Sequence, residues 1–445
     1  MKKNMKKYIK RAGEIILDWK GDNYTFGIGE EILNKTGEYA RRFGKKALIV
    51  APLGQTWAEK LIEKVVNSLK SNGIEYLKIL DAKPNAPRED VYRIAFWLSK
   101  TKSDMIIPIG GGSTIDTAKA GSILSSYLPS ELIDVLGIEE NIASTIEPYF
   151  GTGNVTKMKG KTGKPIIPVL AIQTASSSAA HLTKYSNITD PVIGQKKLIV
   201  DDAIVPQAAI FDYGVTINSP LELTLDGGMD GIAHCWEVFM GAGEQTYYEK
   251  MKEITQIAVW LVVNGLPKIN ENPKDIFARV ALGLGTDLGG YAIMIGGTSG
   301  PHLGSFSLVD LTSHGRACSI LNPYYTVLFA EVIQKQLKII GNIYKDANYI
   351  KANLDNVKRS ELGLIVANGM IEFAKSLGYP TSLKEIGATE EHIKRMLIAA
   401  KNPQLKMKLQ NMPIPMNIDK GDIERLMKPT LEAAFSGNLE ILLNV

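Results

Sequence analysis

Residues 104–128 read DMIIPIGGGSTIDTAKAGSILSSYL, an apolar run that predicts a strand, followed by three glycines and a predicted helix. Glycines let the backbone approach a diphosphate without a Cβ in the way, and a helix N-terminus offers N–H groups and a positive dipole end. A capped turn explains the same residues, with Ser113 as the cap and Asp116 completing a capping box. Because the full GxGxxG fingerprint is missing, phosphate binding and a plain turn both stay open.

Strands and helices alternate on both sides of this stretch. The predicted strands are 45–52, 74–82, 165–173 and 208–212, and further predicted helices are 56–73 and 88–102. Such alternation indicates a doubly wound, mostly parallel α/β sheet whose ligands bind beyond the carboxyl ends of the strands. Residues 150–165, FGTGNVTKMKGKTGKP, interrupt the pattern and are expected to form a mobile or partner-facing loop.

The pattern changes near residue 215, beyond which long helical periodicities replace strand signals. We therefore expect two domains. The first, 1–215, is an α/β domain, and the second, 216–445, is an all-α domain.

Composition excludes several classes of protein. The 445 residues are 45% hydrophobic and 22% charged, as in ordinary globular proteins, and apolar runs stay well short of the ~18 residues of a membrane span. Six basic side chains precede residue 12, and without them the net charge of +4 becomes 4 − 6 = −2. The charge of the remaining chain argues against a nucleic-acid surface. The basic start itself predicts a solvated N-terminal extension. Cys235 and Cys318 form no disulfide framework, so a reducing, cytoplasmic location is expected.

A second candidate stretch, TASSSAAHLT at 174–183, follows a predicted strand. Its hydroxyls and small side chains suit the phosphate and ribose of a nucleotide, although a serine-rich turn explains them equally well.

The segment GGMDGIAHCWE at 227–237 carries Asp230 and His234 four residues apart, hence on one face of a predicted helix. Two of the other histidines, His302 and His314, lie in PHLGSFSLVDLTSHG. On one straight helix they would be about 18 Å apart, so the chain must turn between them to share an ion. One carboxylate and three imidazoles suit Fe(II) or Zn(II) with a position left for substrate, whereas ordinary helix-end histidines are the simpler alternative.

Together these motifs carry a family resemblance. GGGSxxDxAK, the Thr/Ser-rich strand end, GMDxxxHxxE and a later His-Gly pair resemble the iron-containing alcohol dehydrogenase family, as do FGIG near residue 27 and LQNMPIPMNIDKGDIERLM at 409–427. The resemblance covers nearly the whole chain. It implies a nucleotide-binding α/β domain, a metal-binding helical domain, a nicotinamide cofactor in the cleft between them, and a homodimer.

The resemblance also implies site residues. The pyrophosphate would be held by Gly110, Gly111, Gly112 and Ser113, with Asp116 and Lys119 nearby, and the cofactor would be lined by Thr174, Ser178, Thr183 and Lys196. The register of Lys196 is uncertain by one because Lys197 is adjacent. The metal ligands would be Asp230, His234, His302 and His314.

Departures from the family pattern concern proton handling and the shape of the active site, and one of them is that His302 and His314 are two residues closer together than in the family. His181 stands where a glutamate is usual, Ala179 stands where a glycine is usual, and Phe306 replaces a further histidine. His181 and Asp116 are the catalytic candidates, and His181 either relays protons or simply packs at a strand end.

These observations predict a metal-dependent, NAD(P)-linked oxidoreductase that interconverts an alcohol and an aldehyde or ketone by hydride transfer, the ion polarising the carbonyl. A dehydroquinate-synthase-like lyase that uses nicotinamide transiently is the main alternative, but it should need several basic residues near the metal, and Arg316 is the nearest. A binding protein that has lost the chemistry is the third possibility. Pro52 stands where relatives carry a carboxylate that repels the 2′-phosphate, which favours NADP(H) over NAD(H).

Overall fold

The computed structural model describes all residues except 1, 53–55, 135–144, 191 and 193. The chain forms two compact units. One comprises Leu17–Ala175 and Ala179–Ser219, and the other comprises Met1–Ile16, Ser176–Ser178 and Pro220–Val445. The main boundary therefore falls at Ser219, compared with the expected residue 215. No helix among the described residues is long and apolar enough to cross a membrane.

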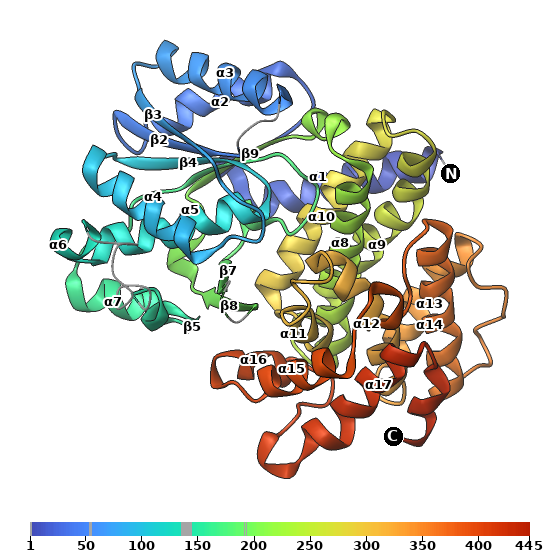
Figure 1. The fold of residues 1–445 in the computed structure, drawn as a ribbon. Coiled ribbons are helices and arrows are strands. Elements are labelled where there is room, and N and C mark those ends of the chain that lie inside the picture. The colour runs from blue at the N-terminus through green and yellow to red at the C-terminus, as the bar shows by residue number, and fades with distance from the viewer. Residues whose placement is uncertain (1, 53–55, 135–144, 191, 193) are drawn as a thin grey trace. The chain divides into compact units, whose positions relative to one another are not determined.

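The first unit contains a six-stranded parallel sheet with the order β1-β9-β6-β4-β2-β3 (Figure 1). Its strands are β1 Tyr24–Gly27, β2 Lys46–Ala51, β3 Glu75–Leu80, β4 Met105–Gly110, β6 Leu170–Gln173 and β9 Ala208–Asp212. This sheet confirms the predicted fold class. The sequence patterns did not predict β1, because four residues are too short for alternation to be recognised.

Helices cover both faces of this sheet (Figure 1). On one face, α2 Glu30–Ala40 and α3 Thr56–Ser71 share a core with the odd-numbered residues of β2. On the other, α4 Arg88–Thr101 and α5 Gly112–Tyr127 share a core with Leu48 and Val50 of the same strand. Because both faces are buried, the strands are continuously apolar rather than alternating.

A smaller sheet with the order β5-β8-β7 lies in the same unit, formed by Gly151–Thr152, Gln195–Val200 and Tyr185–Asp190. The expected loop at 150–165 is wrong, because it contains β5 and the helix α7 Asn154–Thr162. Gly153 and Gly163 adopt positive φ angles at the two ends of this helix. Its second residue, Val155, is buried, so these glycines bound a packed helix instead of loosening a loop.

From Pro220 to Val445 every residue is described and all regular elements are helical. The longer helices are α8 Leu221–Ala242, α9 Tyr248–Glu271, α10 Ile276–Ile295, α12 His314–Leu328, α13 Gln334–Asp346, α14 Arg359–Ser376 and α15 Glu390–Ala400; shorter ones are α11 Gly300–Ser305, α16 Lys406–Gln410 and α17 Lys428–Ser436. Helix α8 is buried along most of its length. A Cβ at Gly289 of α10 would lie 3.2 Å from the Gly231 carbonyl of α8, so glycine permits this close crossing.

The expected solvated N-terminal extension is also wrong. Helix α1, Lys2–Lys20, buries an apolar stripe that includes Met5, Ala12 and Ile15. The Tyr8 ring lies 4.6 Å from the Trp260 ring of α9, and Arg11 Nε lies 2.8 Å from Glu253 Oε1. The basic side chains therefore form the outer face of an amphipathic helix that packs on the helical unit.

Candidate functional site

Helix α8 presents three side chains for the site at positions i, i+4 and i+7. They are Asp230, His234 and Glu237, and all three are buried. Asp230 Oδ2 lies 3.6 Å from His234 Nε2. The predicted pairing of Asp230 with His234 on one helix face is therefore present in the structure.

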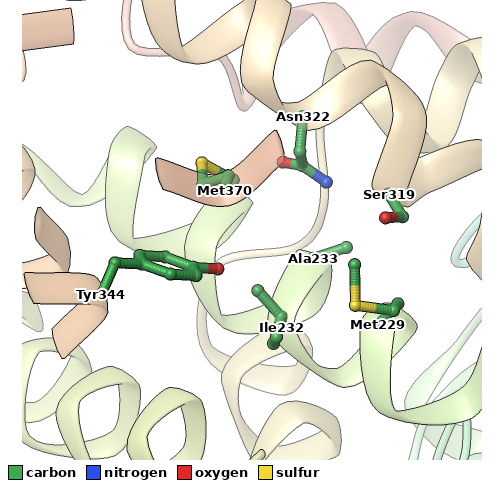
Figure 2. A pocket seen from close by; sticks show the side chains of 7 residues that line it. All are labelled: Met229, Ile232, Ala233, Ser319, Asn322, Tyr344 and Met370. Carbon is green, nitrogen blue, oxygen red and sulfur yellow. The ribbon is translucent and has the colours of Figure 1, made fainter. Parts of the chain in front are cut away.

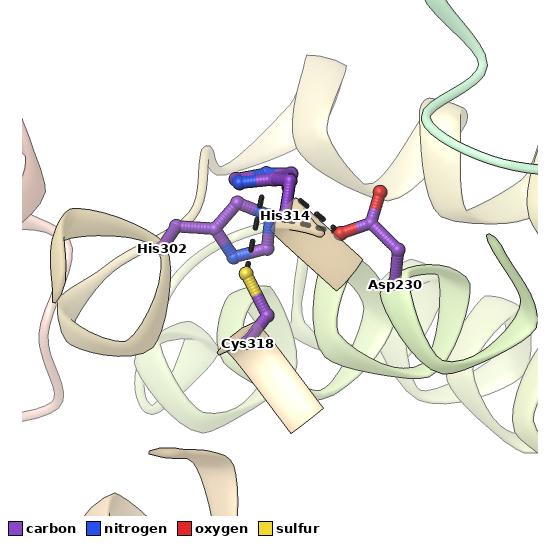
Figure 3. Close-up of side chains that lie close together, drawn as sticks. All are labelled: Asp230, His302, His314 and Cys318. Atoms are coloured by element: carbon purple, nitrogen blue, oxygen red, sulfur yellow. Dashed lines mark hydrogen bonds and ion pairs between the residues drawn. The ribbon is translucent and has the colours of Figure 1, made fainter. Parts of the chain in front are cut away.

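Helices α11 and α12 bring the other two histidines to Asp230 (Figure 3). The chain ends α11 at Ser305 and begins α12 at His314, which confirms the turn that the sequence required. Asp230 Oδ1 lies 3.5 Å from His302 Nε2 and 3.8 Å from His314 Nε2. Cys318, which the sequence patterns did not indicate, joins Asp230, His302 and His314. The ligand atoms of these four residues lie within 4.8 Å of one another, and His234 is not in this set.

Gly315 explains why a histidine–glycine pair stands at the start of α12. A Cβ at this position would overlap the carbonyl oxygen of Asp226 and would lie 3.0 Å from Asp230 Cβ. Only glycine therefore lets the first turn of α12 lie against α8, and this contact brings the neighbouring His314 to Asp230.

Outer partners orient two of the imidazoles. His302 Nδ1 lies 2.6 Å from Glu237 Oε1, and His314 Nδ1 lies 2.9 Å from Ser305 Oγ, which itself donates to the His302 carbonyl at 2.7 Å. The carboxylate and the already donating hydroxyl can only accept from these nitrogens. Both imidazoles thus carry hydrogen on Nδ1. Burial opposes the shift, but Cys318, Glu237 and Asp230 hold the pKa of His302 well above its usual range, so its Nε2 also carries a proton, which a divalent cation would have to displace. Glu237 and Cys318 could have been found from helical spacing, whereas no sequence pattern indicates Ser305.

The charges in this cluster suit metal binding. Burial raises the pKa of the Asp230 carboxyl, but His234 and His314 outweigh it and leave that pKa below its usual range. Burial lowers the pKa of His234 to about 4 although Asp230 opposes the shift. An ionised carboxylate beside a neutral imidazole is the protonation state that a divalent cation needs.

The cluster also has donor atoms that a divalent metal ion would satisfy. Among the described residues, Asp230 Oδ1 and His302 Nε2 are buried and have no hydrogen-bond partner. Buried polar atoms are rarely left in this state, and a shared cation would satisfy both. The oxygen, nitrogen and sulfur donors are those that Zn(II) and Fe(II) accept.

Two further side chains border the cluster. The Phe306 ring stacks on His314, with 5.7 Å between ring centroids and 18° between planes. Lys408 of α16 is buried, binds the Thr298 hydroxyl and lies 5.7 Å from the Phe306 centroid; burial lowers its pKa to about 8. Arg316 is bound instead by Asp226 and Glu222. Sequence reasoning therefore missed a buried basic residue in this region.

A small cavity lies between α8, α12, α13 and α14 (Figure 2). Its volume is about 20 Å³, and it is lined by Met229, Ala233, Ser319 and Asn322 together with Tyr344 and Met370. Asn322 also donates to Glu237 Oε1 at 3.4 Å. None of the proposed metal ligands lines this cavity, so it is not the place where an alcohol bound to the proposed ion would lie.

In the α/β unit, the glycine-rich turn connects β4 to α5. Gly111 precedes the helix, and no side chain caps it, so the predicted capping box of Ser113 and Asp116 is wrong. Ser113 Oγ instead accepts from the Asn85 N–H at 3.0 Å. A Cβ at Gly110 would overlap Thr114, and the first N–H groups of α5 have no intrahelical acceptor. An anion is the natural acceptor for these N–H groups.

Asp116 and Lys119 are buried on α5 and join it to β7. Lys119 Nζ donates to the carbonyls of Thr183 and Tyr185, each at 2.8 Å, and Asp116 Oδ2 accepts from the Asn187 N–H at 3.0 Å. Burial raises the pKa of Asp116 and lowers that of Lys119.

The structure distinguishes the two adjacent lysines of β8. Lys196 is buried and its charge influences Asp116, whereas Lys197 Nζ lies 2.6 Å from Glu147 Oε1. Only Lys196 is therefore placed beside the residues of the predicted cofactor site.

The remaining candidates lie near the strand ends. His181 is buried, its Nε2 lies 3.1 Å from the Tyr24 hydroxyl, and its ring lies 5.5 Å from that of Phe211. This environment is typical of a packed core histidine, and its relay function stays a prediction. The Thr174 N–H donates to the Gly110 carbonyl at 3.1 Å. Ser178 belongs to the other unit, which is formed mainly by Pro220–Val445.

Comparison with known proteins gives consistent matches. Residues 23–213 match the family model described as iron-containing alcohol dehydrogenase, and 224–431 match the C-terminal model of the Fe-containing alcohol dehydrogenase family. The NAD-dependent methanol dehydrogenase of Bacillus methanolicus is 24% identical over 91% of this chain and 97% of its own. The NADPH-dependent butanol dehydrogenase of Clostridium saccharobutylicum is 27% identical over 79% of this chain and 83% of its own. The solved alcohol dehydrogenase from Oenococcus oeni shares the fold, with a TM-score of 0.73 and 22% identity. The match covers 92% of this chain and 98% of that one.

Proposed function

The chain belongs to the iron-containing alcohol dehydrogenase family, and we propose that Asp230, His234, His302 and His314 hold the divalent ion on which its reaction depends. The protein is an NAD(P)-linked oxidoreductase that interconverts an alcohol and its aldehyde or ketone. The observation that carries the proposal is the approach of the His234, His302 and His314 Nε2 atoms to the Asp230 carboxylate within 3.8 Å. A bound ion would polarise the carbonyl, or lower the pKa of the alcohol.

The chain's own residues have distinct functions in this proposal. Glu237 and Ser305 fix the tautomers of His302 and His314, and Phe306 keeps one side of His314 apolar. The diphosphate would bind the N–H groups of α5 at Gly110, Gly111, Gly112 and Ser113, close to Asp116 and Lys119, and the rest of the cofactor would contact Thr174, Ser178, Thr183 and Lys196. Support comes from the only partial burial of Gly111, Gly112 and Ser113 and from the helix N-terminus, which no side chain caps.

The metal site is tested with the variant His234→Ala and the control His392→Ala. His392 lies on α15, where its side chain completes a capping box with Thr389, and it has no part in the cluster. We expect His234→Ala to lose both bound metal and activity, and His392→Ala to keep both. Full metal occupancy in His234→Ala would contradict the assignment.

Coenzyme stoichiometry tests the reaction class. An alcohol oxidoreductase reduces one nicotinamide for each alcohol oxidised, whereas a lyase that uses the cofactor transiently shows no net reduction. The comparisons contain alcohol and aldehyde oxidoreductases and give the lyase no support.

We also propose a preference for NADP(H) over NAD(H). Strand β2 ends at Ala51 and is followed by Pro52, so no carboxylate stands there to repel a 2′-phosphate. Leu53 and Gly54 lie outside the described residues. The neighbouring strand end has Asp81, but Arg93 binds its carboxylate at 2.8 Å and offsets the negative charge. A preference for NAD in kcat/KM of more than about tenfold, or some 1.4 kcal/mol, would contradict this proposal.

We further propose that the protein is a homodimer in the cytoplasm. Both cysteines are free and buried, which suits a reducing compartment. Light scattering on the purified protein measures the oligomeric state, and a monomer at micromolar concentration would contradict the dimer.

A further inference from the structure

The proposed ligand set omits a side chain that lies in the same cluster. Cys318 follows His314 by one helical turn on α12 and is fully buried. Its Sγ lies 4.0 Å from His314 Nε2, and it points into the group formed by Asp230 and His302 (Figure 3). Two donors of this group, Asp230 Oδ1 and His302 Nε2, are buried without a hydrogen-bond partner among the described residues.

The distances approach those between neighbouring ligands of one ion. Bond lengths of about 2.0–2.1 Å to nitrogen or oxygen and about 2.3 Å to sulfur place neighbouring ligand atoms roughly 3.4 Å apart, or roughly 3.6 Å where one is sulfur. The corresponding separations from Asp230 to His302 and His314 are 3.5 and 3.8 Å, and the sulfur separation is 4.0 Å. All four donor atoms lie within 4.8 Å of one another, so shifts of up to about 1.2 Å would place them around one ion.

The second cysteine provides a contrast. Cys235 is equally buried and lies beside His234 in sequence, yet it is not a member of the donor group. Proximity to a ligand along a helix is thus insufficient, and it is the i+4 position of Cys318 that directs its sulfur to the cluster.

We propose that Cys318 binds the divalent ion as a thiolate, as a further ligand beside Asp230, His234, His302 and His314. The inference rests on the proposed metal centre. As the sulfur–metal bond forms, the thiol proton leaves to solvent and no electrons are transferred. Because thiolate is a soft ligand, it shifts the selectivity of the site towards Zn(II) and away from hard cations such as Mn(II).

Cobalt substitution tests the sulfur ligand directly. The full chain is loaded with one equivalent of Co(II), and the near-ultraviolet sulfur-to-cobalt charge-transfer band is compared in the wild type, Cys318→Ser and the matched control Cys235→Ser. We expect the band in the wild type and in Cys235→Ser and its loss in Cys318→Ser. Zn(II) binding should weaken at least about tenfold in Cys318→Ser, since even outer partners of metal ligands contribute 10- to 100-fold.

Several results would overturn the inference. Bound Co(II) without the band in the wild type, or a band that survives in Cys318→Ser, would exclude the thiolate. X-ray absorption on the wild-type zinc protein needs no variant; a sulfur shell at about 2.3 Å is expected, and a shell of nitrogen and oxygen alone contradicts the inference. A wild type that binds no cation at this site would overturn the proposed metal centre as well, which distinguishes the two failures.

Discussion

Replacing Glu237 by glutamine should weaken metal binding about 10- to 100-fold, although no metal ligand is changed. The carboxylate accepts five buried bonds, and the two shortest come from His302 Nδ1 at 2.6 Å and from the Ser299 N–H at 2.8 Å. A glutamine has one acceptor oxygen, so its amide nitrogen must face one of these donors. The lost buried hydrogen bond should cost about 1–3 kcal/mol. The expected loss of affinity corresponds to about 1.4–2.7 kcal/mol, which agrees with this cost.

The assay is competition between the protein and a chromophoric chelator for Zn(II) at fixed pH. Glu249→Gln is the matched control, because Glu249 is exposed on α9 and pairs with Lys252 at 3.1 Å. The control should bind Zn(II) like the wild type. A dissociation constant for Glu237→Gln within twofold of the wild type would refute the claim that Glu237 supports His302.

Three further predictions concern stability and pH. Burial lowers the pKa of Lys20 to about 8 from its ordinary 10.5, so between these values the unfolded chain holds the extra proton and the free energy of unfolding rises with pH. Lys20→Met should remove up to about 1.4 kcal/mol per pH unit of that rise in urea unfolding, and an unchanged slope would contradict the burial effect. A Cβ on Gly227 of α8 would overlap the Ser176 carbonyl, so Gly227→Ala should lower the free energy of unfolding by about 2–3 kcal/mol. A Cβ on Gly160 of α7 meets open space, so Gly160→Ala should raise the free energy of unfolding by about 0.5–1 kcal/mol. Equal thermal midpoints for the two variants would contradict this difference. His181→Ala should destabilise the protein by about 2–4 kcal/mol, because the ring loses its packing on Tyr24 and Phe211. The pH–rate profile of this variant should stay unchanged. An altered profile would instead support a proton relay through His181.

The sequence by itself determined the features that depend on neighbouring residues along the chain. The apolar run to Gly110 and the helix after it became β4 and α5, because a buried strand and a helix face are encoded by short-range periodicity. The same reason places Asp230 and His234 on one face of α8. The change of pattern near residue 215 is likewise a sum of local signals, and the structure changes from strands to helices between Asp212 and Leu221.

Only the tertiary structure decided which distant side chains meet. Glu237 contacts His302 and Ser305 contacts His314 because α11 and the first turn of α12 cross α8, and that crossing depends on the missing side chain of Gly315. The approach of Cys318 to Asp230 has the same origin. The packing of α1 likewise depends on the contact of Tyr8 with Trp260, which lies more than 200 residues away in the sequence. Such contacts follow from close packing between separate elements, and no local pattern of residues encodes where two helices touch.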